Sequence, residues 1–179
     1  PPPYEYQHQS ATANDIQRND PVTYYSKTIW SPVGELTLVA DDRGLAAILW
    51  ENDKPDRVRL GTLSEKADHP VLVETGRQLR EYFAGERRTF DVPLSFAGTE
   101  FQKRVWAALL DIPFGETRSY GEIADQLGNP GAPRAVGAAN GRNPISIIAP
   151  CHRVVGSTGK LTGFAGGLAA KAFLLELER

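Results

Sequence analysis

The sequence predicts an α+β protein in which a small N-terminal domain of strands and one helix is followed by a mainly helical C-terminal domain. Alternating, β-branched and aromatic segments lie before residue 97, whereas helix-capping patterns are concentrated after it. The 179 residues, 41% of them hydrophobic, fit one or two small globular domains with real cores. We expect domains at residues 21–96 and 97–179, preceded by a flexible tail at the polar residues 1–20.

The N-terminal domain is predicted to contain three strands, at residues 23–30, 35–40 and 45–50. Aromatic and β-branched side chains fill the first, and the second alternates between apolar and polar side chains. Residues 41–44 (Asp-Asp-Arg-Gly) have the composition of a hairpin turn. Residues 51–69 are polar and predict a long loop or a frayed helix.

A helix is expected to begin at His69-Pro70 and to end at Gly85. One face of this helix carries apolar side chains and is predicted to be buried: Leu72, Leu79, Tyr82 and Phe83. Residues 89–96 are predicted to form a closing strand. The N-terminal domain has no cluster of polar residues that would indicate chemistry.

The C-terminal domain is predicted to begin with a capping box, because Thr99 is followed three residues later by Gln102. The helix that follows carries one apolar stripe, formed by Phe101, Val105, Trp106 and Leu109. After a loop at residues 115–118, Ser119 is placed to cap a second helix over residues 120–127.

A helix-turn-helix is predicted from the second helix and a third short helix at residues 132–140, with residues 128–131 (Gly-Asn-Pro-Gly) as the break. Arg134 stands where a recognition helix would reach DNA, and the small residues Ala135 and Gly137 allow close approach to a groove or, equally, to another helix. A final helix is expected at residues 168–178. Its apolar side is predicted to comprise Leu168, Ala172, Phe173, Leu175 and Leu177.

Cys151 is the only cysteine, and His152 follows it directly. A thiol beside a histidine can be drawn toward the thiolate, which is the nucleophilic form. The apolar pairs Ile147-Ile148 and Val154-Val155 would shield such a site from water. The alternative is that Cys151 and His152 are ordinary core residues, since many free cysteines are small buried hydrophobes.

The overall charge does not indicate a nucleic-acid-binding protein, because the formal net charge is only -2. Residues 97–179, however, hold nine Lys and Arg against seven Asp and Glu, so the basic excess lies in the domain that carries the cysteine. A single cysteine and three scattered histidines predict neither a disulfide nor a metal site. Together with the lack of a long apolar run or a recognisable signal peptide, this favours an intracellular protein without a membrane span.

The C-terminal motifs resemble those of the O6-alkylguanine-DNA alkyltransferases, the methylated-DNA–protein-cysteine methyltransferases. The matching segments are Ser119-Tyr120, Arg134-Ala135-Val136-Gly137, Asn143-Pro144, Pro150-Cys151-His152-Arg153-Val154-Val155, Gly166-Gly167-Leu168 and Lys171. The resemblance is close over residues 101–178, whereas residues 23–96 resemble the family's variable N-terminal domain only in layout.

This resemblance implies a DNA repair protein that transfers an alkyl group, typically methyl, from O6-alkylguanine in duplex DNA to its own cysteine. Transfer would be irreversible, would occur once per molecule and would need no cofactor or metal. Cys151 would accept the alkyl group, and His152 would act as the general base through a bridging water. Glu178 would orient His152, and Asn143 would join the recognition helix to the active-site segment.

The resemblance also implies how damaged DNA is bound. A monomer would dock its recognition helix, including Ala135 and Gly137, in the minor groove and flip the alkylguanine out of the stack. Arg134 would fill the gap, Tyr120 would assist rotation of the nucleotide, and Tyr120 or Lys171 would protonate the leaving guanine. We would then expect the protein in the cytoplasm, associated with the nucleoid, or in a nucleus.

The sequence leaves open the effect of three positions and three alternative functions. Phe164 and Ala165 stand where family members often carry tyrosine and serine, and Asn140 stands where some carry an apolar pocket residue, so the accepted alkyl size is not fixed. Other readings are a damage-binding protein without transfer activity, a fragment of a transcriptional regulator, and a thiol hydrolase that turns over. We further expect His152 and Glu178 to lower the pKa of the Cys151 thiol. Without the resemblance, Tyr120 would be read as core, Glu178 as a surface charge and Arg153 as a structural partner of a carboxylate or the backbone.

Overall fold

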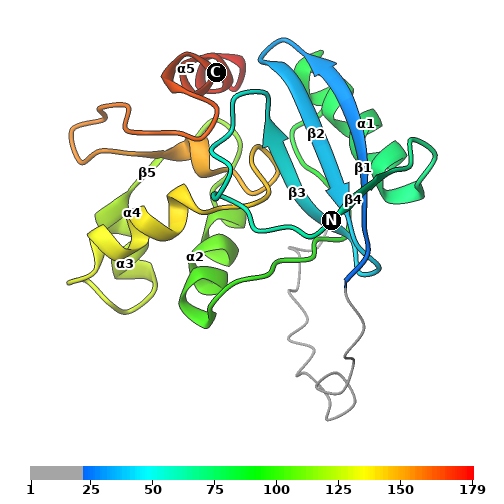
Figure 1. Cartoon of the computed structure of the whole chain (residues 1–179). Helices are drawn as coiled ribbons and strands as arrows, with labels where there is room; N and C mark the ends of the chain where they lie inside the picture. Colours follow the sequence, from blue (N-terminus) through cyan, green and yellow to red (C-terminus); the bar gives the residue numbers. More distant parts are fainter. Residues whose placement is uncertain (1–21) are drawn as a thin grey trace.

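The strands and the helices gather in two adjoining parts of the molecule. A computed structural model describes residues 22–179, so the predicted tail at residues 1–20 lies outside the described residues. A sheet and one helix come from the N-terminal half, and the C-terminal helices pack beside them (Figure 1). The α+β fold class is confirmed.

The N-terminal sheet has four strands in the order β3-β2-β1-β4. Strands β1 (Tyr24–Ser31), β2 (Gly34–Ala40) and β3 (Leu45–Trp50) form an antiparallel meander, which confirms the three predicted strands. The short strand β4 (Leu63–Glu65) pairs parallel with β1 and was missed, because its three side chains are all exposed and carry no hydrophobic alternation.

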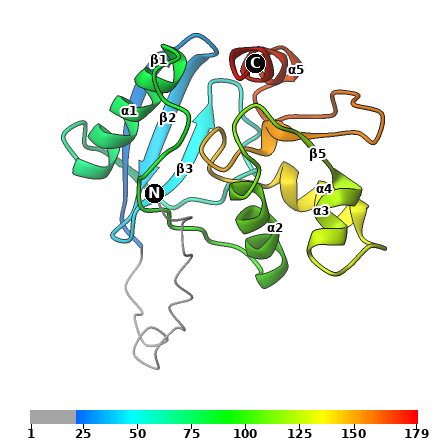
Figure 2. The ribbon, with the colours of Figure 1, turned by 180° about the vertical axis from the view of Figure 1, so that it is seen from behind.

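Helix α1 (Pro70–Phe83) lies across β1 and β2 (Figure 2), and the Nδ1 atom of His69 accepts a hydrogen bond from the Val71 N–H at its start. The predicted strand at residues 89–96 is wrong. This segment makes only an isolated bridge to β3, in which Leu45 donates its N–H to the Pro93 carbonyl at 2.8 Å. Pro93 has no N–H to donate, so a continuous ladder cannot form there.

Four helices form the C-terminal part: α2 (Glu100–Leu110), α3 (Tyr120–Gln126), α4 (Pro133–Gly141) and α5 (Leu168–Leu177). The Thr99–Gln102 capping box is present, and Ser119 caps α3 as predicted. Three of the four predicted α2 core residues are buried, while Phe101 is half-buried. Helices α3 and α4 pack against each other and against α2, which gives the expected helix-turn-helix arrangement.

The predicted apolar side of α5 is largely wrong. Leu168 and Phe173 are 52% and 39% exposed, and the fully buried side consists of Ala170, Lys171 and Leu174, with Glu178 at the C-cap. The buried side therefore includes two ionisable residues. The apolar pattern of the sequence could not identify this side of the helix. The charges of Lys171 and Glu178 are tolerated there because each side chain is hydrogen-bonded to a residue in a distant part of the chain.

The segment after α4 lies between the N-terminal sheet and the C-terminal helices. Ile145 forms an isolated parallel bridge with Ile48 of β3, and the Ile48 N–H donates to the Pro144 carbonyl at 2.9 Å. Farther along, β6 (Val154–Val155) pairs with β5 (Arg118–Ser119) next to α3. The cysteine segment is thus held between the N-terminal sheet and the helix-turn-helix.

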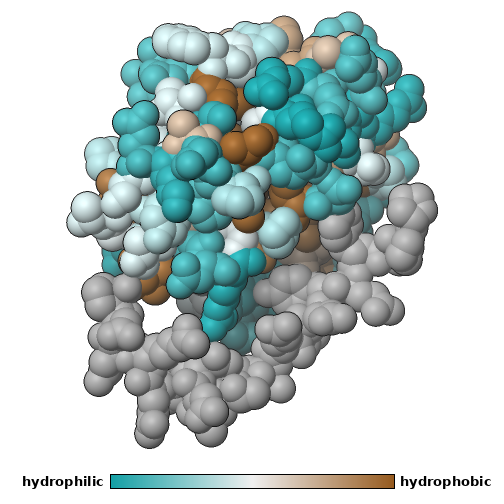
Figure 3. Space-filling model, turned by 90° about the vertical axis from the view of Figure 1, so that its right-hand side faces the viewer, coloured by the Kyte–Doolittle hydropathy of each residue, from teal (hydrophilic) through white to brown (hydrophobic). Residues whose placement is uncertain are grey.

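The outer side of the sheet and α1, turned away from the C-terminal helices, is mostly hydrophilic with small separate hydrophobic areas (Figure 3). Trp30 of β1 is 77% exposed, in contrast to Trp50 at the end of β3, which is 7% exposed. The two tryptophans therefore mark the solvent side and the inter-domain side of one sheet.

Candidate functional site

Cys151 begins a single 3-10 turn, η2 (Cys151–Arg153), and is only 3% exposed. The two predicted apolar pairs, Ile147-Ile148 and Val154-Val155, are all buried around it. The backbone leading to the cysteine is unusual, because Ile147 has a φ of 74°. A β-branched residue rarely adopts this left-handed conformation, so the tertiary structure holds the segment in a strained path.

Burial raises the pKa of the Cys151 thiol above its ordinary value. Hydrogen bonds from Asn143 and Ser146 and the positive charges of Arg57 and Lys171 act in the opposite direction. The expectation of a lowered pKa caused by His152 and Glu178 is therefore wrong. Desolvation of the thiolate dominates, and local sequence does not reveal how deeply a thiol is buried.

His152 is fully buried, and its Nε2 atom lies 2.8 Å from the Glu178 Oε2 atom. A carboxylate only accepts hydrogen bonds, so Nε2 carries the proton. Burial lowers the pKa of His152 and keeps the ring neutral. The Nδ1 atom has no hydrogen-bond partner among the described residues, so it presents a free lone pair.

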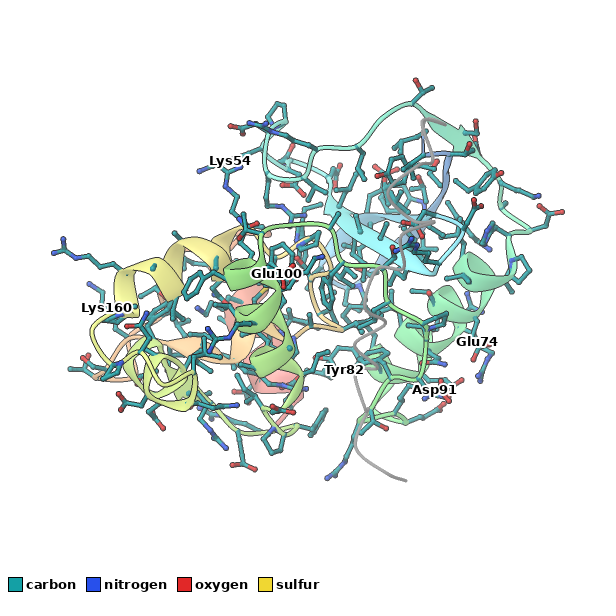
Figure 4. All side chains as sticks on the ribbon, turned by 90° about the horizontal axis from the view of Figure 1, so that it is seen from below. Lys54, Glu74, Tyr82, Asp91, Glu100 and Lys160 are labelled. Carbon is teal, nitrogen blue, oxygen red and sulfur yellow. The ribbon has the colours of Figure 1, made fainter. Side chains whose placement is uncertain are left out.

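Glu178 is the centre of a buried network behind His152. Its carboxylate accepts from the Tyr82 hydroxyl at 2.6 Å and from the Arg153 Nε at 2.7 Å. Burial alone would raise the pKa of Glu178, but the hydrogen bonds from His152, Arg153 and Tyr82 outweigh it and lower the pKa to about 2. Tyr82 reaches this carboxylate from α1, and Figure 4 shows its position between the two parts of the molecule.

This network decides two alternatives that the sequence left open. Glu178 is not a frayed surface charge, because it is 3% exposed. Arg153 is a structural partner of both a carboxylate and the backbone. It forms an ion pair with Glu178 and also donates to the Ile112 carbonyl at 2.6 Å.

Asn143 ties together the segment that leads to the cysteine. Its Oδ1 accepts from the Ile145 N–H at 3.1 Å, and its Nδ2 donates to the Ala149 carbonyl at 2.8 Å. Arg57 from the N-terminal domain donates to the Asn143 carbonyl and, at 3.0 Å, to the Ile48 carbonyl. Both ends of the loop between α4 and η2 are thus fixed by buried hydrogen bonds.

Tyr120 and Lys171 come together through Thr162. The Tyr120 hydroxyl is hydrogen-bonded to the Thr162 hydroxyl, and the buried Lys171 Nζ lies 3.4 Å from the same oxygen. Lys171 also donates to the Val154 carbonyl at 2.6 Å. Burial lowers the pKa of Lys171, whereas its attraction to Cys151 acts to raise it.

The outer face of α4 contrasts with this interior. Arg134 and Ala135 are exposed, so they lie where a partner could reach them. Gly137 is turned partly toward α3, because a Cβ atom there would lie 3.6 Å from the Tyr120 ring. Asn140 is 6% exposed, and its Oδ1 has no hydrogen-bond partner among residues 22–179.

The structure thus places Cys151 close to Asn143 and Lys171, and pairs His152 with Glu178, but it leaves Arg134 on the separate outer surface. Sequence reasoning missed several residues that support the site: Trp50, Arg57, Thr162 and Ser146, together with the hydroxyl role of Tyr82. Four of these five come from outside the cysteine segment, and no local motif marks them.

The described residues offer neither a metal-binding cluster nor a membrane-spanning helix. Residues 22–179 contain no group of three His, Cys, Asp or Glu that could hold a metal ion. None of the helices formed by these residues is long and apolar enough to cross a membrane.

Comparison with known families accounts for nearly the whole described chain. Residues 100–179 match the model of the 6-O-methylguanine DNA methyltransferase, DNA binding domain. Residues 24–96 match the model of the 6-O-methylguanine DNA methyltransferase, ribonuclease-like domain.

Similar proteins come from bacteria and archaea. The methylated-DNA–protein-cysteine methyltransferase of Mycobacterium tuberculosis is 54% identical over 159 residues, covering 86% of this chain and 91% of that protein. The protein of the same name from Methanosarcina acetivorans is 53% identical over 153 residues, covering 83% and 94%. A crystal structure of Mycobacterium tuberculosis OGT in complex with DNA is 52% identical and superimposes with a TM-score of 0.78, covering 86% of this chain and 92% of that one.

Proposed function

The chain belongs to the 6-O-methylguanine DNA methyltransferase family, and on this basis we propose that it repairs DNA by moving an alkyl group from O6-alkylguanine to Cys151. Two observations carry the proposal: the only thiol is buried, and the residue next to it in the sequence is a buried, neutral histidine whose Nδ1 atom has no hydrogen-bond partner among the described residues. This arrangement supplies a nucleophile and a base without a metal ion.

In the proposed reaction the Cys151 sulfur attacks the alkyl carbon while the bond from that carbon to the guanine O6 breaks. The thiol proton passes to the His152 Nδ1, through a bridging water. The resulting imidazolium is stabilised by Glu178, whose lowered pKa keeps it ionised. Because burial raises the thiol pKa, the resting group is the thiol, and proton removal accompanies attack.

The leaving guanine carries negative charge and needs a proton. Tyr120 is the proposed donor, and its hydrogen bond to Thr162, which also lies within 3.4 Å of the Lys171 ammonium, supports this role. The positive charge of Lys171 would stabilise the phenolate that forms when Tyr120 gives up its proton.

The product on Cys151 is a thioether, which water does not readily cleave. Each molecule would therefore act once. The thiol hydrolase alternative requires an intermediate that water can release, and a protein that only binds damage would have no use for an acceptor thiol. The proposed transfer uses both the Cys151 thiol and the neighbouring base His152.

Binding to duplex DNA is proposed to involve the outer face of α4. Exposed Arg134 and Ala135 support close approach to the minor groove, and Gly137, although turned partly toward α3, adds no side chain that would obstruct it. Flipping the damaged base costs a few kcal/mol, and Arg134 inserted into the vacated space would offset part of that cost. One monomer would serve one flipped base, with Asn143 as the rigid joint between α4 and Cys151.

The test is to incubate the full chain with a duplex containing O6-methylguanine and to measure the intact mass of the protein. We expect one added methyl group, located on Cys151 by peptide mapping, and saturation at one equivalent. Continued consumption of methylated DNA by a small amount of protein, or methyl addition elsewhere, would overturn the proposal.

A further inference from the structure

Trp50, the last residue of β3, is the point at which the N-terminal sheet touches two loops of the C-terminal domain. Its indole N–H donates to the Ser146 hydroxyl oxygen at 3.1 Å, and both side chains are buried. Its ring also meets Phe164 edge-on, with the centroids 5.3 Å apart. One side chain thus contacts the segment before Cys151 and the loop before α5.

The contact with the second loop is close enough to constrain its sequence. A Cβ atom at Gly166 would lie 2.7 Å from carbons of the Trp50 ring, which no real side chain could do without displacing the loop or the indole. The loop that carries Phe164 therefore rests directly on the tryptophan. Trp30, on the solvent side of the same sheet, makes no comparable contact and is 77% exposed.

The direction of the Trp50–Ser146 hydrogen bond has a chemical consequence. An indole N–H can only donate, so Ser146 accepts through its oxygen and keeps its own proton available for another acceptor. Ser146 is fully buried five residues before Cys151, and its hydroxyl is one of the groups that act to lower the pKa of the Cys151 thiol against the effect of burial. Trp50 thus fixes the oxygen of a hydroxyl whose proton is left for the Cys151 thiol.

We propose that Trp50 is a positioning residue for alkyl transfer, whose indole N–H aims the Ser146 hydroxyl at the Cys151 sulfur. In this way the N-terminal domain would influence the reactivity of the acceptor thiol, which lies in the C-terminal domain. The inference rests on the proposed function only in taking Cys151 as the acceptor. A hydrogen bond to sulfur favours the thiolate over the thiol, so its loss should shift reactivity toward higher pH.

The other groups around the sulfur are left in place when the indole is replaced by a phenyl ring. They are the Asn143 amide, the charges of Arg57 and Lys171, and the adjacent His152 with Glu178 behind it. Asp53, which pairs with Arg57, binds the backbone N–H of residue 50 and not its side chain. Trp50→Phe therefore removes the donor and keeps an aromatic ring beneath the loop.

The experiment measures the rate of Cys151 alkylation by iodoacetamide against pH in the full-length chain, since this reagent needs neither DNA nor a protonated leaving group. For Trp50→Phe we expect a profile moved to higher pH, a rate roughly tenfold lower at neutral pH and an unchanged high-pH plateau. Ser146→Ala should give the same shift, and the double variant should lose no more than either single one. Trp30→Phe is the matched control and should behave as wild type.

An unchanged profile for Trp50→Phe would overturn the proposal, as would additive losses in the double variant. A uniform slowing at every pH would also overturn it, because loop packing alone would then explain the effect. Methyl transfer from an O6-methylguanine duplex is measured in parallel with the wild-type chain. If that transfer fails while the iodoacetamide shift appears, the proposed function is wrong, whereas the effect of Trp50 on the reactivity of the Cys151 thiol stands.

Discussion

The interior around Cys151 and the outer face of α4 are built in opposite ways. Around the thiol, polar side chains from α1, η2 and the end of α5 are buried and joined by hydrogen bonds as short as 2.6 Å. On α4, the exposed surface consists of Arg134, which carries one positive charge, and of neighbours with small side chains. Under the proposed function, bond breaking and base extraction therefore belong to separate regions, and substitutions should affect them independently.

The largest expected effect is on the nucleophile. Cys151→Ser should abolish methyl transfer, because a hydroxyl is a far weaker nucleophile, while affinity for duplex DNA should stay within about twofold because phosphate and groove contacts lie elsewhere. Peptide mapping and a DNA-binding titration measure the two properties. Methyl transfer at the normal rate by the serine variant would remove Cys151 from its assigned role.

A smaller but still large effect is expected at the base. His152→Ala should slow transfer by roughly a hundredfold or more near neutral pH, in the range typical of a lost general base. Raising the pH should recover part of the loss, because the thiol, whose pKa is raised by burial, then ionises without help. If the rate of methyl transfer by His152→Ala depends on pH in the same way as that of wild type, His152 is not the general base.

The buried network should also contribute to stability in acid. The pKa of Glu178 is lowered to about 2 from 4.5, so its contribution is complete above about pH 4.5 and is lost as the pH falls toward 2. Glu178→Gln leaves the buried Arg153 charge without its partner and should lower the free energy of unfolding by roughly 3 kcal/mol at neutral pH.

Chemical unfolding at pH 7 and at pH 3 would measure this difference. The gap between wild type and Glu178→Gln should narrow at the lower pH, because at pH 3 the Glu178 carboxyl of the unfolded chain binds a proton while that of the folded protein stays largely ionised. Tyr82→Phe is a useful control, because it removes one hydrogen bond to the same carboxylate and leaves the ion pair in place. A gap of constant size at both pH values would argue that Glu178 acts through packing and not through its charge.

The smallest effect concerns salt. The formal net charge is -2, and the exposed face of α4 offers few cations, so few phosphates should be neutralised on binding. The affinity for duplex DNA should fall with salt with a logarithmic slope of magnitude below about 5. A slope like that of a protein with 6–10 phosphate contacts would show that the DNA-binding surface extends well beyond α4.

The two regions also differ in how far the sequence predicts them. The α2 and α3 starts follow from local patterns, because Thr99 and Ser119 hydrogen-bond within their own first turns. The helix-turn-helix was also predicted from a local signal, because residues 128–131 (Gly-Asn-Pro-Gly) break the chain between α3 and α4. Local interactions of this kind need no knowledge of tertiary contacts.

The interior was predicted less completely, because its properties arise from distant contacts. The raised thiol pKa depends on burial in a core built from several C-terminal elements, and the buried charges on α5 depend on partners such as Val154 and Tyr82. The family resemblance named Glu178 and Lys171 as site residues, yet the apolar pattern assigned α5 the wrong buried side. Trp50, Arg57 and Thr162 lie outside the resembling motifs, so only the structure relates them to the cysteine.

The separation of chemistry from base extraction is tested most directly by comparing two substrates in two variants. Rates of transfer to Cys151 are measured from an O6-methylguanine duplex and from free O6-methylguanine base, for Arg134→Ala and for His152→Ala. Arg134→Ala should lose roughly tenfold on the duplex and less than about twofold on the free base, which needs no extrusion. His152→Ala should lose the same factor on both. Equal losses on both substrates for Arg134→Ala would contradict the separation.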